Sequence, residues 1–158
     1  MRSDPDVIIL GEVRDAETAR NAVKAAETGH LVLATLHTGS IFGAVQRLRD
    51  LEVPAHELRY LLRTVLVQRL MRVYCVSCGG KGCAKCGNTG YGARTVVSEC
   101  AYFPGEEEVT ALLEGKSWWP TMMEDGVMRV EQGLTSPAEA VRVFGAEAEA
   151  LLKTKGLL

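Results

Sequence analysis

Residues 6–12 read Asp6-Val7-Ile8-Ile9-Leu10-Gly11-Glu12, and residues 30–37 read His30-Leu31-Val32-Leu33-Ala34-Thr35-Leu36-His37. Each stretch contains an apolar run of strand length, which is typical of a strand buried on both faces of a sheet. Asp15 is expected to cap a helix between the two runs, and Gly29 is expected to end it. This β-α-β order predicts two parallel strands joined by a right-handed crossover, and therefore an α/β fold.

Two further helices are expected after the second strand. One begins at Ser40, and a longer one begins at Pro54 and carries apolar residues at helical spacing as far as Leu70. From Cys75 to Gly92 the composition changes to Cys, Gly and Lys without periodicity, which indicates an inserted loop. The segment 94–99 is expected to be a strand that returns from this loop.

The remainder of the chain is predicted to be helical. One helix is expected from Glu106 to Glu114, and a second is expected from Pro120 to Gln132. A third begins at Ser136-Pro137-Ala138-Glu139, which reads as a capping box with Pro at the first helical position. We therefore divide the chain into residues 1–73, the cysteine-rich loop 74–92, and a mainly helical part 93–158.

Composition limits the possible partners of the 158 residues. The chain is 47% hydrophobic and 24% charged with a net charge of −2, so no field strong enough to attract nucleic acid is expected. No apolar run approaches the roughly 20 residues that a membrane helix needs, and the first residues lack the apolar stretch of a signal peptide. We expect a cytoplasmic protein with no transmembrane segment and no nucleic-acid partner.

Glu12 and His37 are the candidate catalytic residues. Each directly follows one of the two predicted parallel strands, and ligands bind at the carboxyl ends of such strands. A carboxylate at this place can orient water or help to hold Mg²⁺ beside a nucleotide γ-phosphate. Two alternatives stay open: Glu12 pairs with Arg14 or caps the next helix, and His37 is a hydrogen-bonded histidine at a strand end.

His30 precedes the second strand and should lie at its opposite end. Seven strand residues span about 23 Å, so His30 and His37 cannot share one metal ion. We exclude a two-histidine metal site.

Four cysteines form the strongest chemical signal. The spacing Cys75-x2-Cys78-x4-Cys83-x2-Cys86 provides two knuckles that together complete a tetrahedral Zn(Cys)4 site, and reduced cytosolic thiols favour metal over disulfides. Four thiolates leave no open position, so the zinc would be structural. A redox dithiol, an iron–sulfur site or an empty loop are the alternatives.

Residues 75–82 also match C-x-x-C-x-G-x-G of the DnaJ-type cochaperones, but nothing else supports that function. Cys100 is expected to be a small buried residue.

Six arginines recur on the two helices expected after the second strand: Arg47, Arg49, Arg59, Arg63, Arg69 and Arg72. A solvated helix face is one interpretation, and contacts between subunits are the other.

Two long segments carry a resemblance to a known family. Residues 2–15 resemble the Walker B segment of the type II secretion and type IV pilus assembly ATPases, and residues 27–38 are similar to their histidine box. Gln68-Arg69-Leu70 before the cysteine pairs and Gly90-Tyr91-Gly92-Ala93-Arg94 after them also look like this family. The resemblance implies the C-terminal portion of a RecA-like P-loop NTPase domain, with a zinc knuckle and a helical C-terminal subdomain.

The same resemblance implies roles for single residues. Glu12 would be the catalytic Walker B glutamate, and His37 would act near the phosphates. Arg14 and His30 would lie in the vicinity of the nucleotide site. ATP and Mg²⁺ are implied for a complete enzyme, which would be a hexameric ring at the cytoplasmic face of the bacterial inner membrane, bound to a platform protein.

The family's P-loop, G-x-x-x-x-G-K-[ST], does not occur in the 158 residues, and Gly79-Gly80-Lys81-Gly82 does not supply it. Without that cradle for the β- and γ-phosphates, we expect this chain alone to be inactive as an ATPase. The alternative function is a non-catalytic, zinc-dependent interaction module that binds ring subunits or the platform protein. An incomplete sheet with an open edge also predicts self-association.

Overall fold

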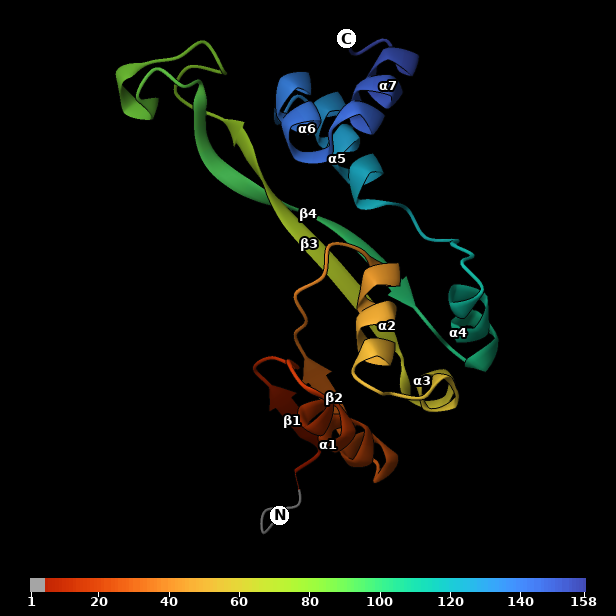
Figure 1. The fold of residues 1–158 in the computed structure, drawn as a ribbon. Coiled ribbons are helices and arrows are strands. Elements are labelled where there is room, and N and C mark those ends of the chain that lie inside the picture. The colour runs from red at the N-terminus through yellow and green to blue at the C-terminus, as the bar shows by residue number, and fades with distance from the viewer. Residues whose placement is uncertain (1–4) are drawn as a thin grey trace. The chain divides into compact units, whose positions relative to one another are not determined.

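The computed structural model describes residues 5–158, which form an α/β architecture as predicted. A one-turn 3₁₀ helix, Ala84–Cys86, lies inside the cysteine-rich loop. The other elements follow in the order β1 (Val7–Leu10), α1 (Ala16–Glu27), β2 (Leu31–Ala34), α2 (Ile41–Asp50), α3 (Ala55–Leu61), β3 (Thr64–Tyr74), β4 (Tyr91–Tyr102), α4 (Glu106–Leu113), α5 (Met122–Glu131), α6 (Pro137–Phe144) and α7 (Ala146–Thr154) (Figure 1).

The described chain packs as two compact units, each assembled from two stretches of sequence. The first unit contains the described part of Met1–Val67 together with Cys100–Trp119, and the second contains Gln68–Glu99 with Pro120–Leu158. Strands β3 and β4 pair with each other and contribute to both units. They run in opposite directions, with the cysteine-rich loop between them (Figure 1). The division into the domains 1–73, 74–92 and 93–158 stays a prediction.

The first unit begins with the predicted crossover. Strands β1 and β2 are parallel, with Val7 opposite Leu31 and Leu10 opposite Ala34. The carboxylate of Asp15 caps α1 by accepting from the Thr18 N–H at 2.8 Å, which satisfies a donor that the helix itself leaves free. The β-α-β order and the cap at Asp15 are therefore confirmed.

One expectation about this sheet is wrong for the described chain. The apolar side chains at alternate positions of β1 and β2 are exposed rather than buried: Val7, Ile9, Leu31 and Leu33, of which Ile9 is 75% exposed. The cause is that the sheet has two strands among the described residues, and α1 packs against it without covering this face. The four side chains form an exposed apolar rectangle, which we call the open face.

The long helix expected from Pro54 is also wrong. Helix α3 ends at Leu61, and the chain then forms strand β3 from Thr64. Val67 and Met71 are buried while Leu66 and Leu70 are exposed, as expected for a strand with one packed face. Arg69 and Arg72 consequently lie on β3, and Arg63 precedes it, so the six arginines do not share two helices.

Helices α5, α6 and α7 form the core of the second unit with the paired strands. Gly126 of α5 allows close packing, because a Cβ at this position would collide with the Phe144 ring and approach the Met71 sulfur to 3.2 Å. Thr121 and Glu124 form a reciprocal capping box at the start of α5. The helices predicted for 106–114 and 120–132 are confirmed within two residues at both ends, and the helix predicted from Ser136 begins at Pro137.

Helix α6 departs from its predicted cap. Ser136 accepts from the Glu139 N–H at 3.1 Å, and Pro137 occupies the first helical position, as expected. The Glu139 carboxylate does not return to the Ser136 backbone; it is fully buried and binds the side chains of Arg72 and Arg142. Two guanidinium partners outweigh one backbone N–H.

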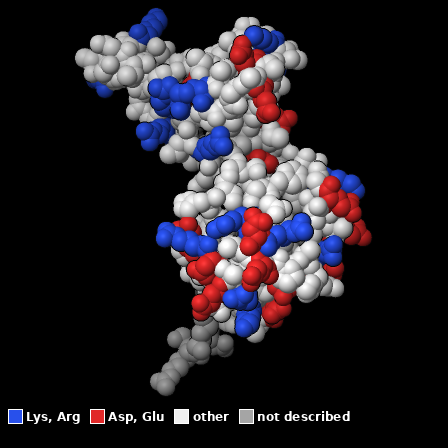
Figure 2. Space-filling model, in the orientation of Figure 1, with Lys and Arg blue, Asp and Glu red and all other residues white. Residues whose placement is uncertain are grey.

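No helix within residues 5–158 is both long enough and apolar enough to cross a membrane. On the displayed face of the first unit, acidic and basic side chains lie side by side, so neither sign dominates there (Figure 2).

Candidate functional site

Glu12 and His37 meet at the carboxyl ends of β1 and β2. The Nε2 atom of His37 lies 3.2 Å from an Oε1 oxygen of Glu12, and Arg14 binds the other carboxylate oxygen at 2.6 Å. The Glu12 side chain is 19% exposed, whereas His37 and Arg14 are largely exposed. The predicted proximity of Glu12 and His37 is confirmed, and so is the alternative pairing of Glu12 with Arg14.

The backbone around Glu12 is tied to the second strand beyond the regular sheet. The Val13 N–H donates to the Thr35 carbonyl at 2.9 Å, and the Thr35 hydroxyl donates to the Gly11 carbonyl. These two bonds bracket Glu12 on both sides. They fix its backbone relative to the segment that carries His37, so the contact between the two side chains rests on an ordered frame.

Arg47 of α2 supports the same loop from another direction. Its guanidinium donates to the Arg14 carbonyl oxygen at 3.0 Å. The loop from Glu12 to Arg14 is thus held by β2 through Thr35 and by α2 through Arg47. Sequence reasoning placed Arg47 only within a set of six arginines and did not single out Thr35.

His30 lies apart from this group. Its Nδ1 atom is 2.9 Å from the Ala25 carbonyl oxygen and 3.0 Å from the Thr28 hydroxyl, so the ring closes the end of α1. It precedes β2, whereas His37 follows it. The structure therefore brings together three of the four residues that the resemblance implies at a nucleotide site. The position of His30 near that site stays a prediction.

The cluster of Glu12, Arg14 and His37 suits the chemistry of an anionic ligand with an attacking water. A carboxylate can accept a proton from water or position it, and the exposed imidazole and guanidinium can face negative oxygens. The arrangement lacks a loop of backbone N–H groups that would hold phosphates by itself. A phosphate cradle has to come from residues other than these.

The second candidate site is the predicted cysteine cluster. Within residues 5–158, Cys75, Cys78, Cys83 and Cys86 form the one group of three or more Cys, His, Asp or Glu side chains placed to hold a metal ion, with all Sγ atoms within 4.8 Å of one another. Three Sγ–Sγ separations are 4.0, 3.9 and 3.8 Å. A tetrahedral ion with metal–sulfur bonds of about 2.3 Å requires sulfur separations of about 3.8 Å. The four thiols therefore fit one tetrahedral ion.

Tight turns place the two cysteine pairs. The Gly79 N–H donates to the Cys75 carbonyl at 2.8 Å, and the Asn88 N–H donates to the Cys83 carbonyl at 2.9 Å. The backbone reverses through left-handed conformations, most clearly at Gly90, where a Cβ would collide with the Gly80 carbonyl oxygen. The loop is held by turns and by its sulfur cluster rather than by apolar packing.

The thiols are unequal before any ion binds. Burial raises the pKa of the Cys78 thiol to about 11. Burial also acts to raise the pKa of Cys86, but hydrogen bonds from the Cys83 and Gly90 backbone outweigh it and lower this pKa to about 6. Cys100 is exposed on β4, so the expectation that it is a buried residue is wrong.

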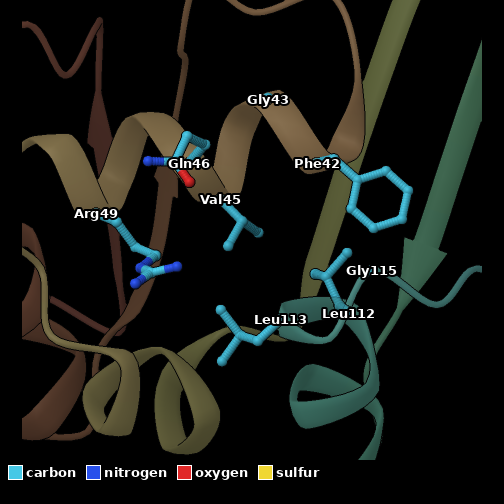
Figure 3. Close-up of a pocket in the computed structure, with 8 residues that line it drawn as sticks. All are labelled: Phe42, Gly43, Val45, Gln46, Arg49, Leu112, Leu113 and Gly115. Atoms are coloured by element: carbon cyan, nitrogen blue, oxygen red, sulfur yellow. The ribbon is translucent and has the colours of Figure 1, made fainter.

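A pocket of about 320 Å³ lies elsewhere in the first unit, between α2 and α4. Val45, Leu112 and Leu113 point into it, with Arg49 at one end and Phe42 at the other (Figure 3). It shares no lining residue with the Glu12 cluster or with the cysteines. It is an apolar recess without an acid–base pair, and we do not assign it to the chemistry of either site.

Comparison with known proteins places the chain in a family. The family described as "Type II/IV secretion system protein" matches residues 1–142. The chain belongs to this family. Relatives in the same family include the type II secretion system protein E of Klebsiella pneumoniae, 38% identical over 175 aligned residues, and the type II secretion system protein HxcR of Pseudomonas aeruginosa, 40% identical over 163.

The chain spans about a third of these secretion-family proteins: each alignment covers 90% of this chain but 35% of the Klebsiella protein and 34% of HxcR. The protein transport protein HofB homolog of Haemophilus influenzae is 38% identical over 146 residues, with 92% of this chain and 30% of that protein covered.

Solved structures support the secretion-family fold. The Legionella pneumophila ATPase DotB superposes with a TM-score of 0.69 at 25% identity, covering 90% of this chain and 39% of DotB. The Yersinia pseudotuberculosis ATPase DotB gives a TM-score of 0.66 at 20% identity, covering 89% and 37%, and this likeness concerns the fold alone. The α/β fold expected from the resemblance is therefore confirmed.

Proposed function

We propose that these 158 residues form the C-terminal part of a motor ATPase that powers type II protein secretion or type IV pilus assembly. The 3.2 Å contact between Glu12 and His37 at the ends of two parallel strands carries this proposal. In it, the Glu12 carboxylate orients the attacking water, and His37 faces the phosphates beside it. Arg14 holds the carboxylate in place and lies in the vicinity of the nucleotide, as His30 would in a complete ring.

The proposal includes a division of labour between this chain and a P-loop that it does not contain. ATP and Mg²⁺ would bind where a G-x-x-x-x-G-K-[ST] segment, from the same protein or another chain, meets the Glu12 cluster. The open face gives this idea a physical basis, because parallel sheets are normally covered on both sides. The 158 residues alone would then not turn over ATP.

The cysteine cluster would hold structural Zn²⁺ in this proposal. Four thiolates at tetrahedral separations satisfy the ligand set that zinc prefers and leave no position for a reacting water. The zinc would contribute folding free energy to the loop rather than chemistry. The proposed setting is a hexameric ring at the cytoplasmic face of the inner membrane, in contact with a platform protein.

A chimeric enzyme tests the catalytic assignment. The N-terminal two thirds of the Klebsiella relative would be joined to residues 1–158 and assayed for ATP hydrolysis. We expect E12Q to lower kcat by at least about 100-fold while nucleotide binding persists, because general-base or water-positioning groups contribute this much. E17Q, an exposed acid on α1, is the matched control. Full turnover in E12Q would show that Glu12 is not catalytic.

A second function is favoured by one specific observation. The open face presents four large apolar side chains. Such a surface suits a protein contact, so the chain would alternatively be a non-catalytic, zinc-dependent module that binds ring subunits. The chimera separates the two ideas. An interaction module would leave ATP turnover unchanged when Glu12 or His37 is substituted, whereas the motor ATPase would lose turnover in E12Q.

A further inference from the structure

A continuous series of contacts leads from the cysteine loop to the buried carboxylate of Glu139. It begins at Gly80, between the two cysteine pairs, where a Cβ would lie 2.7 Å from the Tyr74 ring. The glycine lets that ring lie against the loop. Tyr74 in turn stacks on Tyr91 with ring centroids 6.0 Å apart and planes at 12°. One aromatic pair therefore contacts the loop directly.

The series continues through a cation to the helices. The Arg72 guanidinium lies 4.3 Å above the Tyr91 ring centroid. Its Nε donates to the Glu139 carboxylate at 2.9 Å, and Arg142 of α6 donates to the same carboxylate at 2.7 Å. The Tyr91 hydroxyl also bonds to the Ser136 hydroxyl at the start of α6. Tyr91 and Arg72 thus both bond to residues at the start of α6.

The backbone of β3 follows the same route. On its side away from β4, three main-chain groups bond to the corner between α5 and α6. The Arg72 N–H donates to Glu139 at 2.9 Å, the Thr135 hydroxyl donates to the Arg72 carbonyl at 2.6 Å, and the Tyr74 N–H donates to the Leu134 carbonyl at 2.9 Å. Cys75 is the next residue along the chain. The α5–α6 corner therefore fixes the strand up to the first thiol.

The other end of the loop is fixed by the same pair of strands. The Cys75 N–H donates to the Gly90 carbonyl at 2.8 Å, directly before Tyr91. The positions at which the chain enters and leaves the cysteine loop are thus set by residues that pack on α6. The loop has no apolar core, so these anchors and the sulfur cluster are what define its shape.

We propose that Tyr74, Tyr91, Arg72 and Glu139 are positioning residues of the metal site, and that metal binding and the seating of α6 on β3 stabilise each other. The inference rests on the metal site proposed above. Outer groups that orient ligands typically change metal affinity by about 10- to 100-fold when removed. Because coupling between two equilibria is reciprocal, the ion must protect α6 by the same factor that seated α6 gives to metal affinity.

Zinc affinity of the whole 158-residue chain, measured by competition with a chromophoric chelator, tests the first half. We expect Y91L, which removes the stack, and E139Q, which removes the carboxylate, to weaken zinc binding about 10-fold or more. R72K keeps the charge but loses the planar fork and serves where E139Q does not fold. Y102F, on the exposed end of β4, should leave the affinity unchanged.

Hydrogen exchange of α6 with and without zinc tests the second half. We expect metal removal to speed exchange in α6 of the natural chain by about the factor found for affinity, and to have much less effect in E139Q. If Y91L and R72K bind zinc as tightly as the unsubstituted chain, or if hydrogen exchange in α6 is the same with and without zinc, the coupling is overturned while the metal site stands. A natural chain that takes up no zinc would overturn the metal site and the coupling together.

Discussion

The carboxylate of Glu12 lies 3.2 Å from the His37 imidazole because the Thr35 side chain and backbone bond to the residues on either side of Glu12. The pair is therefore held by the backbone of two parallel strands rather than by the flexible side chains alone. Under the proposed function this would matter, since a group that positions water must keep its place within fractions of an ångström.

Arg47 offers a direct test of how the loop from Glu12 to Arg14 is held. In the chimeric ATPase, R47A should lower kcat about 10-fold with little change in KM, because it removes the donor to the Arg14 carbonyl but no proposed substrate contact. Arg49 lies on the same helix and has no bond to that loop among the described residues, so R49A should turn over ATP at the rate of the unsubstituted chimera. Equal losses in both variants would contradict the assignment.

Zinc content should depend on four cysteines and not on the fifth. C78S should reduce bound zinc, measured by metal analysis of the purified chain, and should lower its melting temperature, since a loop without a core depends on the ion. C100S is the matched control, because Cys100 is exposed and lies outside the cluster. Cobalt substitution should give the thiolate charge-transfer absorption of a four-sulfur site. Zinc retained in C78S at natural stoichiometry would exclude this ligand set.

The buried Glu139 should make stability depend on acid pH. Burial alone would raise the pKa of its carboxyl, but hydrogen bonds from Arg142 and Arg72 lower this pKa to about 2. An unfolded glutamate titrates near pH 4.3, so the stabilisation is complete above about pH 5 and disappears as the pH falls towards 2.

Urea unfolding of the metal-free chain at pH 7, 5 and 3 measures this contribution. The stability gap between the natural chain and E139Q should be largest at pH 7 and should narrow at pH 3. E149Q, which removes an exposed pair with Lys153, should show a small gap at every pH. A gap for E139Q that widens on acidification would have the wrong sign for a carboxylate with a depressed pKa.

The open face should cause self-association when the chain is studied alone. We expect sedimentation velocity to show concentration-dependent assembly, and the double variant I9S/L33S to shift it towards monomer, because it removes apolar area from the exposed rectangle. Y60S changes an exposed apolar residue on α3 and should not have this effect. A natural chain that stays monomeric at high concentration would contradict the prediction.

The parts of the fold that sequence reasoning recovered have strong local signals. Two short apolar runs with Asp15 and Gly29 between them define the crossover, and the cysteine spacing defines the cluster. The helix predicted from Pro54 failed because Leu58, Leu62, Leu66 and Leu70 recur every four residues, as on a helix face. Pairing with β4 makes Thr64–Tyr74 a strand, and that partner lies far along the chain.

Two misses have the same origin in distant contacts. Ser136 and Glu139 have the spacing of a capping box, but Arg72 approaches Glu139 from a strand that local sequence does not place beside it. Arg47 was one of several arginines, and its bond to the Arg14 carbonyl becomes visible only when α2 is placed against the loop. Local patterns indicate which residues are polar or helical; tertiary packing decides which partners they meet.

The hydrogen bond between Cys75 and Gly90 makes the cysteine loop an insertion whose two ends lie together. Since the chain leaves β3 and re-enters β4 at adjoining points, residues can be gained or lost between the cysteine pairs without displacing either strand. The Klebsiella alignment runs over 175 positions while covering 90% of this chain, and the Haemophilus alignment runs over 146 while covering 92%, so the two relatives differ in how many residues they insert opposite this chain. An exchange of whole loops between such proteins should preserve the architecture on which they are mounted.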